Sequence, residues 1–445
     1  MAKRQLAVLI LAAGKSTRMK SSISKVLHPV GGRSLIGHVL AMADSLSPDR
    51  VNIIIGNDMD MTRQAVAPIP CIVQDPPKGT GHAVQCARDA LDGFEGDILV
   101  LYGDTPLLNA GTIQEMRRAA EAGPTSVVVL GFRPDDAAAY GRLVVDDDNR
   151  LEAIVEFADA TEQQKSIDLC NSGVMLLNAP TCWAVLDAID NDNAKQEYYL
   201  TDAVAIANAG GGLCTVVEAN ADELLGVDSR ADLAAAEAIF QRHMRAAALD
   251  GGTTLQDPDS VYFSFDTILG RDVTVGPHVV FGPQTTVEGG VVIEAFCHIE
   301  GAYIASGARI GPFARLRPGA DIGEDVHIGN YVEVKKSRIE TGVKANHLAY
   351  IGDAHIGAGT NIGAGTITAN YDGFNKHHTE IGSNVSIGSN VVLVAPIKVG
   401  DGVLIGAGST VSDDVKADDL AVVRADRKDI SDGGARFRAA RKKKT

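Results

Sequence analysis

The sequence predicts an α/β domain followed, after one connecting helix, by a parallel β-helix. Three observations predict this order. Short apolar runs alternate with helical patterns up to about residue 228, which is typical of a parallel sheet covered by helices. An Ala-rich helical segment follows at residues 229–252. Beyond residue 268 an aliphatic residue recurs at every sixth position, and this period fits neither a helix nor a simple strand.

The apolar runs of the first domain, residues 1–228, indicate buried strands. We expect strands at residues 8–11, 51–55, 98–101 and 126–130, and helices at residues 34–43, 113–120 and 200–208. Runs that are apolar throughout indicate a parallel sheet with both faces buried. Ligands of such sheets bind beyond the carboxyl ends of the strands, so we expect a site in the loops after Leu11 and Leu101.

The segment after residue 228 predicts a single helix that connects the two folded parts. Ser229 and Asp232 have the spacing of a capping box, in which each residue bonds the other's backbone amide. The segment continues to Leu249, and Gly251 with Gly252 ends it. We therefore take residues 229–252 as the linker and residues 253–424 as the second domain.

The six-residue repeat predicts the coils of a parallel β-helix, in which three hexads per coil point aliphatic side chains into a narrow core. One unbroken set is Ile304, Ile310, Leu316, Ile322 and Ile328. The phase slips over the steps 328–339, 351–356 and 368–381, and each slip must be absorbed by a bend or by a loop. The last step contains residues 370–378, which we interpret as a binding loop, with a tolerated surface insertion as the alternative.

Composition and charge narrow the class of protein. The 445 residues include 41 Lys+Arg and 57 Asp+Glu, and the formal charge of −16 disfavours a nucleic-acid binder or a partner for acidic membranes. No apolar run reaches the ~18 residues of a membrane span, so we expect no integral membrane association. The six cysteines include no CxxC pair, which indicates reduced thiols and a cytoplasmic location. Residues 1–13 faintly resemble a signal peptide, but a buried first strand explains them better.

The last residues, 425–445, form a basic tail without apolar periodicity. We expect this tail to be disordered. Its charge alone does not predict RNA or membrane binding.

The loop after the first strand carries the groups of an anion site. It contains Gly14-Lys15-Ser16 and Arg18, and Lys25 follows shortly after it. A P-loop would need glycine where Leu9 stands, so that motif is excluded. Backbone amides with two cations suit a nucleoside triphosphate or a leaving pyrophosphate. Taken alone, the loop fits an ordinary strand-to-helix turn equally well.

These residues resemble the LxxGxGTRM…K signature of the sugar-1-phosphate nucleotidyltransferases, with Ser16 in place of a family glycine. The resemblance continues through Gly79-Thr80-Gly81-His82-Ala83, which matches the segment that reads the uracil base, and through Tyr102-Gly103-Asp104 at a strand end. It implies a Rossmann-like nucleotidyltransferase domain in which Arg18 and Lys25 are catalytic. The implied nucleotide- and sugar-binding residues are Leu11, Ala12, Ala13, Gly14, Lys25, Gln74, Gly79, Thr80, Tyr102, Gly103, Asp104, Gly141, Glu156, Asn171 and Asp228.

The chemistry of such an enzyme explains the charged residues. A sugar-1-phosphate oxygen must attack the α-phosphorus of a nucleoside triphosphate, and the two polyanions repel each other until cations screen them. The resemblance implies a Mg²⁺ ion held by Asp104 and Asp228. The family commonly has asparagine at the second position, so Asp228 adds a charge there. A helix-capping role for Asp228 is the alternative, because it directly precedes Ser229.

The β-helix carries a second group of cations. With 18 residues per coil, Arg317 and Lys335 should lie one coil apart on the same face and form a pocket for phosphate. His347 follows near that face, where regular packing would supply a small residue. A lone histidine is more often structural, but its cationic neighbours and the loop at Asn370 favour a reactive role.

These segments resemble the acetyltransferase half of the bacterial bifunctional N-acetylglucosamine-1-phosphate uridyltransferase/glucosamine-1-phosphate N-acetyltransferase family, over nearly the whole chain. The resemblance implies a left-handed β-helix, a homotrimer with shared sites, and His347 as the general base. It implies that the aminosugar phosphate binds to Arg317, Lys335, Tyr350, Asn361 and Lys376. Asn370 and Tyr371 would contact the acyl group, and coenzyme A would bind to Ala364, Ser389, Ala407 and Arg424.

The leading hypothesis is an enzyme with two activities. It acetylates glucosamine-1-phosphate with acetyl-CoA and then transfers UMP from UTP to N-acetylglucosamine-1-phosphate, releasing pyrophosphate and UDP-N-acetylglucosamine for peptidoglycan and lipopolysaccharide precursors. One alternative is a nucleotidyltransferase for another sugar-1-phosphate whose β-helix is purely structural. A non-enzymatic assembly protein with the same folds is the third hypothesis.

Overall fold

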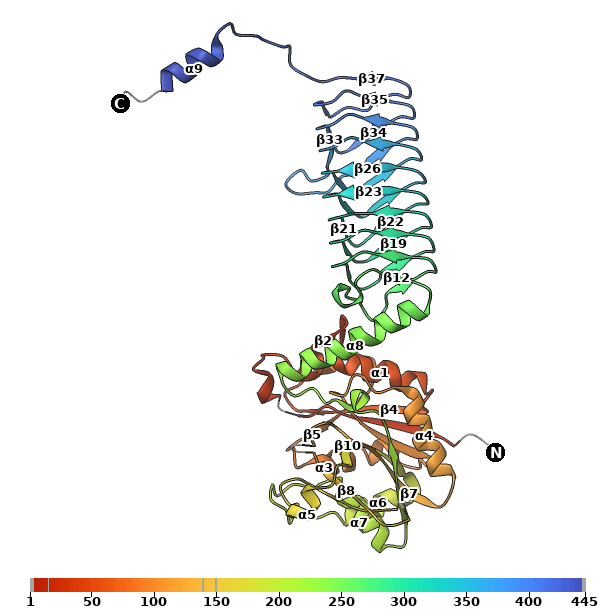
Figure 1. The fold of residues 1–445 in the computed structure, drawn as a ribbon. Helices are drawn as coiled ribbons and strands as arrows, with labels where there is room; N and C mark the ends of the chain where they lie inside the picture. Colours follow the sequence, from red (N-terminus) through yellow and green to blue (C-terminus); the bar gives the residue numbers. More distant parts are fainter. Residues whose placement is uncertain (1–3, 15, 138–139, 149, 442–445) are drawn as a thin grey trace. The chain divides into compact units, whose positions relative to one another are not determined.

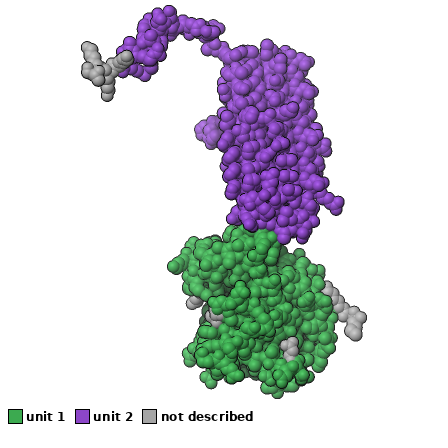
Figure 2. Space-filling model, viewed as in Figure 1, with its two compact units in different colours: residues 1–243 green, residues 244–445 purple. Residues whose placement is uncertain are grey.

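The structure is a computed structural model that describes residues 4–14, 16–137, 140–148 and 150–441 (Figure 1). The chain divides into two compact units, residues 1–243 and residues 244–445 (Figure 2). The division falls within helix α8 (Arg230–Asp250), which is the helix that the sequence predicts as the linker.

Unit 1 is built on a nine-stranded sheet with the order β11-β7-β10-β6-β1-β4-β5, in which β8 pairs with both β9 and β10. Its strands are β1 (Leu6–Leu11), β4 (Arg50–Gly56), β5 (Cys71–Gln74), β6 (Asp97–Tyr102), β7 (Thr125–Phe132), β8 (Arg142–Val145), β9 (Leu151–Val155), β10 (Cys170–Asn178) and β11 (Leu213–Glu218). A separate two-stranded sheet joins β2 (Pro29–Val30) and β3 (Arg33–Ser34). All four predicted strands are present, as parts of β1, β4, β6 and β7.

Helices cover both faces of this sheet (Figure 1). They are α1 (Leu35–Ser45), α2 (Asp60–Ala65), α3 (Thr80–Gln85), α4 (Ala110–Glu121), α5 (Glu162–Lys165), α6 (Ala179–Asp187) and α7 (Asp202–Ala209). Short 3₁₀ turns occur at η1 (Thr17–Met19), η2 (Lys25–Leu27), η3 (Asp89–Leu91) and η4 (Ala221–Leu224). One core packs against α1 and α4, and the opposite core packs against α3, α6 and α7.

Strand β1 shows why a continuous apolar run indicates a buried strand. Leu6, Val8 and Ile10 belong to the core under α1 and α4, whereas the alternating residues Ala7, Leu9 and Leu11 belong to the other core. Both faces of the strand are therefore buried, as its continuous apolar sequence predicts.

The sheet differs from the prediction in one respect, because it is not parallel throughout. Strand β10 lies between β6 and β7 and pairs with both in the antiparallel direction. Its pairing with β7 is irregular between Asn171 and Met175, where polar residues and glycine interrupt the apolar run. Because of this interruption, the sequence pattern does not predict β10 as a strand.

Helix α8 begins with the predicted capping box. Ser229 N donates to Asp232 Oδ2 at 2.8 Å, and Asp232 N donates to Ser229 Oγ at 3.2 Å. The helix ends at Asp250, directly before the two glycines.

Unit 2 is a left-handed parallel β-helix with three sheets, one on each side of its triangular core. The first sheet contains β12 (Thr254–Leu255), β14 (Thr274–Val275), β17 (Val292–Ile293), β20 (Arg309–Ile310), β23 (His327–Asn330), β26 (Lys344–His347), β29 (Asn361–Ile362), β32 (Ser386–Ile387), β35 (Leu404–Ile405) and β37 (Leu420–Ala421). The second contains β13 (Ile268–Leu269), β16 (Thr286–Val287), β19 (Ala302–Ile304), β22 (Ala320–Ile322), β25 (Ser337–Ile339), β28 (Ala354–Ile356), β31 (Thr379–Ile381) and β34 (Ile397–Val399). The third contains β15 (Val280–Phe281), β18 (His298–Ile299), β21 (Arg315–Leu316), β24 (Glu333–Lys335), β27 (Tyr350–Gly352), β30 (Ile367–Ala369), β33 (Val392–Val394) and β36 (Thr410–Val411). A 3₁₀ turn, η5 (Pro258–Ser260), lies near its start.

The phase slips are absorbed in two ways. The two short steps end at tight corners, where Lys336 (φ 44°) and Asp353 (φ 50°) adopt the left-handed backbone conformation. The long step is a loop that leaves the β-helix between β30 and β31 (Figure 1). Phe374 at its tip is 90% exposed, so the tip of this loop does not pack on the core.

Part of the tail that the sequence predicts to be disordered is helical. Residues Gly433–Arg441 form helix α9, whose alanine and arginine residues favour a helix. The helix has no buried residue. Residues 442–445 of the basic tail lie outside the described residues.

The hexad core generates a test of stability. Leu316 is fully buried between three sheets, so Leu316→Ala should lower the free energy of unfolding of the β-helix by about 2–5 kcal/mol. Circular dichroism during urea unfolding would measure this change. The one tryptophan, Trp183, lies in α6 of unit 1, so its fluorescence reports on the other unit. An equal shift of the Trp183 transition would contradict an independent β-helix core.

Candidate functional sites

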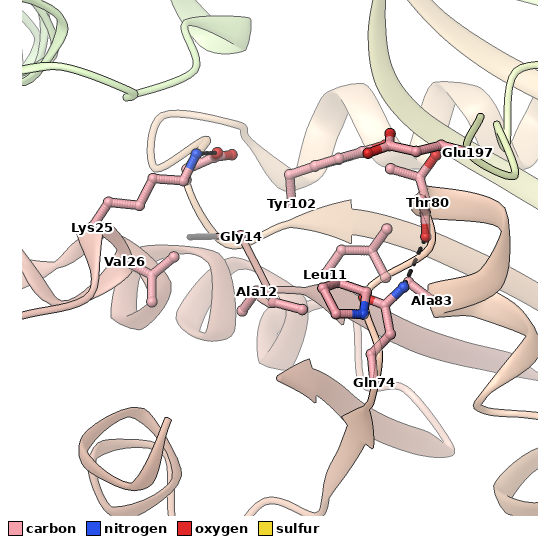
Figure 3. Close-up of a pocket in the computed structure, with 14 residues that line it drawn as sticks. Leu11, Ala12, Gly14, Lys25, Val26, Gln74, Thr80, Ala83, Tyr102 and Glu197 are labelled. Carbon is pink, nitrogen blue, oxygen red and sulfur yellow. Dashed lines mark hydrogen bonds and ion pairs between the residues drawn. The ribbon is translucent and has the colours of Figure 1, made fainter. Parts of the chain in front are cut away.

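A pocket of about 520 Å³ lies beyond the carboxyl ends of β1 and β6 (Figure 3). Leu11 pairs with Tyr102 in register, so the loops that follow these two strands are neighbours. The pocket lies where the sequence predicts a site. Its lining includes ten of the predicted residues: Leu11, Ala12, Ala13, Gly14, Lys25, Gln74, Gly79, Thr80, Tyr102 and Asp104.

The glycine-rich turn at residues 79–83 forms a wall of this pocket because of close backbone packing. Gly79 has φ +107°, and a Cβ there would lie 2.6 Å from the carbonyl oxygen of Tyr198. Gln74 Nε2 donates to Gly79 O at 2.9 Å, which fixes the turn (Figure 3). Only glycine fits this position.

The Lys25 side chain forms ion pairs with two carboxylates near the loop that follows β1. Its ammonium group contacts Asp104 and lies 2.6 Å from Asp228 Oδ1. Arg18 Nη2 lies 2.8 Å from Asp228 Oδ2. The structure therefore brings the two predicted catalytic cations and the two predicted metal ligands into one cluster.

Burial and charge act in opposite directions on this cluster. Burial lowers the pKa of Lys25, but the charges and hydrogen bonds of Asp104 and Asp228 outweigh it, so the pKa lies above its ordinary value. Burial raises the pKa of Asp104, and Lys25 offsets this only in part. A carboxylate in such a site is best stabilised when a cation is close to it.

Two departures from the family signature have structural explanations. Ser16 takes the left-handed conformation, with φ 46°, and its Oγ accepts a hydrogen bond from Lys25 N at 2.9 Å. The Ser16 side chain therefore holds the backbone of Lys25 in place. Asp228 does not cap α8, because its carboxylate bonds to Lys25 and Arg18. Lys15, in the same loop, lies outside the described residues.

The predicted sugar-contacting residues lie beside the pocket, not among its lining residues. Asn171 N donates to Gly141 O at 2.8 Å, and Thr201 Oγ1 donates to Glu156 at 3.3 Å. Burial raises the pKa of Tyr102, and the charges of Asp104 and Glu156 raise it further, so both carboxylates lie within range of this ring. Gly103, next to Tyr102, donates its N–H to Leu11 O at 3.0 Å.

Glu197 also lines the pocket, and the sequence gives no signal for it. It reaches the pocket because the chain next to it packs on the glycine-rich turn. Tyr198 N donates to Lys78 O, and Gly81 N donates to Tyr198 O, both at 2.8 Å. A contact between segments more than a hundred residues apart leaves no local pattern.

In unit 2, three cations meet at one corner of the β-helix. Leu316 pairs with Val334 in register, so Arg317 and Lys335 follow on the same face, as the 18-residue spacing predicts. A contact with Lys376 lowers the pKa of Lys335, and the charges of Lys376 and Arg317 lower it further. The loop at residues 370–378 supplies Lys376. Such a cluster suits a phosphate.

Carboxylates hold parts of this site in place. Arg317 Nη1 lies 2.7 Å from Glu333 Oε1, a partner that the sequence reasoning missed. Asn370 Nδ2 lies 2.5 Å from Asp353 Oδ2 and 3.5 Å from the hydroxyl of Tyr350, and Asn370 is buried. The loop beyond Asn370 is exposed, including Tyr371.

His347 lies at another corner, in a column of residues from successive coils. Backbone bonds run from Gly365 N to His347 O, from Asn390 N to Ala364 O and from Gly408 N to Ser389 O. The column of small residues after His347 consists of Ala364, Ser389 and Ala407, which are the residues predicted to contact coenzyme A. Arg424 lies close to its end, near Gly406 and Gly408.

In the coils that precede His347, the same corner carries large aromatic side chains. Phe296, Phe313 and Tyr331 stack there with ring centroids 4.9 and 5.1 Å apart. The coils after His347 therefore carry smaller side chains at this corner than the coils before it.

The structure places Asn361 apart from the other residues that are predicted to bind the aminosugar phosphate. Asn361 lies in β29 on the first sheet, where it pairs with Lys344. Arg317, Lys335 and Tyr350 belong to strands of the third sheet or directly follow one. Within one chain, Asn361 is therefore separate from the cation cluster.

The two folds and their sites define the class of protein: a nucleotidyltransferase joined to a hexapeptide-repeat transferase. Residues 8–200 match the family model of the MobA-like NTP transferase domain, and residues 301–336 and 378–413 match the bacterial transferase hexapeptide model.

Curated relatives match the whole chain. It is 54% identical to the bifunctional protein GlmU of Paramagnetospirillum magneticum, over 99% of this chain and 98% of the relative. It is 55% identical to the same protein of Rhizorhabdus wittichii over 99% and 98%, and 53% identical to that of Rhodospirillum rubrum over 97% and 97%. The chain belongs to the bifunctional GlmU family. The predicted combination of uridyltransferase and glucosamine-1-phosphate acetyltransferase is thereby confirmed.

Among the residues that the structure describes, none of the helices is both long and apolar enough to cross a membrane.

The close packing of Gly79 generates a test of the nucleotide pocket. Gly79→Ala should lower kcat/KM for uridylyl transfer at least tenfold, because the new Cβ must displace the backbone that lines the pocket. Gly93→Ala is the matched control, because Gly93 also has a positive φ but a Cβ there meets no described atom within 4 Å. It should lose only ~1–2 kcal/mol of stability and keep its activity. Equal losses of activity in both variants would contradict the role of the clash.

Proposed function

We propose that unit 2 acetylates glucosamine-1-phosphate with acetyl-CoA and that unit 1 transfers UMP from UTP to the resulting N-acetylglucosamine-1-phosphate. The observation that carries this proposal is the presence of two anion sites with different reacting groups. One combines Lys25 and Arg18 with two carboxylates, and the other combines Arg317, Lys335 and Lys376 with a histidine at the next corner. A β-helix that only assembled subunits would need neither these cations nor His347.

In unit 1, the sugar phosphate attacks the α-phosphorus of UTP, and pyrophosphate leaves. Lys25 and Arg18 lie where they can neutralise phosphate charge as the two polyanions approach. The glycine-rich turn at Gly79, with Gln74 and Thr80, borders the part of the pocket assigned to the base. The sugar is assigned to the side of Gly141, Glu156 and Asn171.

The carboxylates of unit 1 fit a Mg²⁺ ion that is shared with substrate. Asp104 and Asp228 both reach one ammonium group, so both can reach one cation. The described residues contain no group of three or more metal-binding side chains, so phosphate oxygens and water would complete the shell. When bound, the ion supplies charge neutralisation at the phosphates. Asp104 and Asp228 would hold it.

In unit 2, His347 removes a proton from the amine of glucosamine-1-phosphate as the amine attacks the thioester carbonyl. The thiolate of coenzyme A leaves, and the amide forms. Arg317, Lys335 and Lys376 hold the phosphate, and the amide of Asn370 and the hydroxyl of Tyr350 lie beside it. Coenzyme A extends along Ala364, Ser389 and Ala407 toward Arg424, with Tyr371 near the acyl group.

We assign a homotrimer to the active form. The position of Asn361, on a different sheet from the cation cluster of its own chain, supports a site that a neighbouring subunit completes. The six free cysteines support a reducing compartment, the cytoplasm. The products serve the synthesis of cell-wall precursors.

The separate sites predict reciprocal losses. His347→Ala should lower acetyl transfer at least a hundredfold while uridylyl transfer persists, because a general base contributes about 10²–10⁴ to the rate. Lys25→Ala should do the reverse. Coenzyme A release and pyrophosphate release would be measured on the same preparations. Loss of both activities in either folded variant would count against this assignment, and a wild type without CoA release would favour the structural β-helix.

The carboxylate pair predicts a change in magnesium requirement. Asp104→Asn should raise the Mg²⁺ concentration for half-maximal uridylyl transfer at least tenfold, because it removes one anionic ligand. Asp228→Asn should raise it less, because the Asp228 side chain is more exposed than that of Asp104 and also pairs with Arg18. Asp222→Asn is the matched control, since Asp222 pairs with Arg242 instead. A Mg²⁺ requirement identical in all three variants would refute the assignment of these ligands.

A further inference from the structure

Asn330 is the residue of the preceding coil that lies against His347. The two residues pair in register between β23 and β26, and Leu348 N donates to Asn330 O at 3.0 Å. The Oδ1 atom of the Asn330 side chain lies 2.6 Å from Nδ1 of His347. The side-chain contact therefore rests on a backbone pairing that fixes both residues.

We propose that Asn330 is a positioning residue that holds His347 in the tautomer needed for catalysis. An amide oxygen accepts a hydrogen bond, so Nδ1 carries the proton and Nε2 carries the free electron pair. Nε2 is then the atom that takes the proton from the attacking amine. This inference rests on the proposed acetyl transfer at His347.

The neutral character of Asn330 is part of the proposal. A carboxylate at this position would stabilise the imidazolium form, and the base would then be protonated over a wider pH range. An amide orients the ring without adding that charge. Histidines that act as bases are commonly oriented by a partner at the second ring nitrogen.

Several titratable and charged groups lie near His347. Arg309 and Glu294 line the same groove and form an ion pair with each other. His327 also lines the groove, and burial lowers its pKa, as do the charges of Arg309, His347 and Lys344. Lys344 lies on the strand of His347, and Glu333 of the preceding coil is bound to Arg317. Asn330 is thus the group bonded to the ring.

Two variants of the full-length protein test the proposal. Asn330→Ala removes the acceptor, and we expect kcat for acetyl transfer to fall roughly tenfold with little change in KM for glucosamine-1-phosphate. Asn330→Asp keeps an acceptor oxygen, so we expect most of kcat to return at high pH. Its added charge should shift the acidic limb of the pH profile upward by about one unit. Urea unfolding of the β-helix, followed by circular dichroism, is the control for folding, because uridylyl transfer is assigned to the other unit.

Three results would overturn the proposal. They are a kcat for Asn330→Ala equal to the wild type, an equal loss in Asn330→Asp at every pH, and a pH profile of Asn330→Asp that does not move. A purely structural role predicts the second and third of these. If the wild type itself released no coenzyme A, the proposed acetyl transfer would fail instead, and the two failures are distinguishable.

Discussion

Parallel pairing of strands in a fixed register is the constraint on which both sites depend. In unit 1 it places Leu11 opposite Tyr102, so that the loops after β1 and β6 form one pocket. In unit 2 it places Arg317 beside Lys335 and His347 beside Asn330. Parallel strands share their carboxyl ends at one edge, and coils of a β-helix repeat each position a few ångströms further on. Residues distant in sequence therefore meet at fixed distances.

Some of the charged groups that this register brings together lie in unfavourable surroundings. Burial raises the pKa of Asp104 in unit 1, while neighbouring cations lower the pKa of Lys335 in unit 2. In each case the charged form is less favourable than in water. A substrate phosphate would relieve the repulsion among Arg317, Lys335 and Lys376, because it brings the opposite charge. Binding energy of this kind is available only to an anionic ligand.

The sequence predicts those features of the fold that repeat. Continuous apolar runs predict the strands of unit 1, and the six-residue period predicts the core of unit 2, including Leu316 and Ile322. The spacing of 18 residues predicts the meeting of Arg317 and Lys335. Sequence patterns do not predict features that occur only once, because these depend on how distant segments of the chain pack together.

Three cases show the physical reason. Glu197 enters the nucleotide pocket through backbone bonds to a turn far away in the sequence. Strand β10 is antiparallel, and polar residues interrupt its apolar run. Asn330 and His347 are 17 residues apart, so an 18-residue rule does not pair them, and only the shortened corner at Lys336 brings them into register.

At the corner that carries His347, successive coils keep the same backbone conformation while their side chains differ. Phe313, Tyr331 and Leu348 all have φ between 52° and 57°, a conformation that costs an ordinary side chain ~1–2 kcal/mol. Stacking of the two aromatic rings, worth about 0.5–1.5 kcal/mol, offsets part of this cost. The equivalent residues of the following coils are Gly365, Asn390 and Gly408, which tolerate the same conformation without a bulky side chain. The backbone thus stays constant while the side chains change at His347, and this change leaves the coils after the histidine with smaller side chains at the corner.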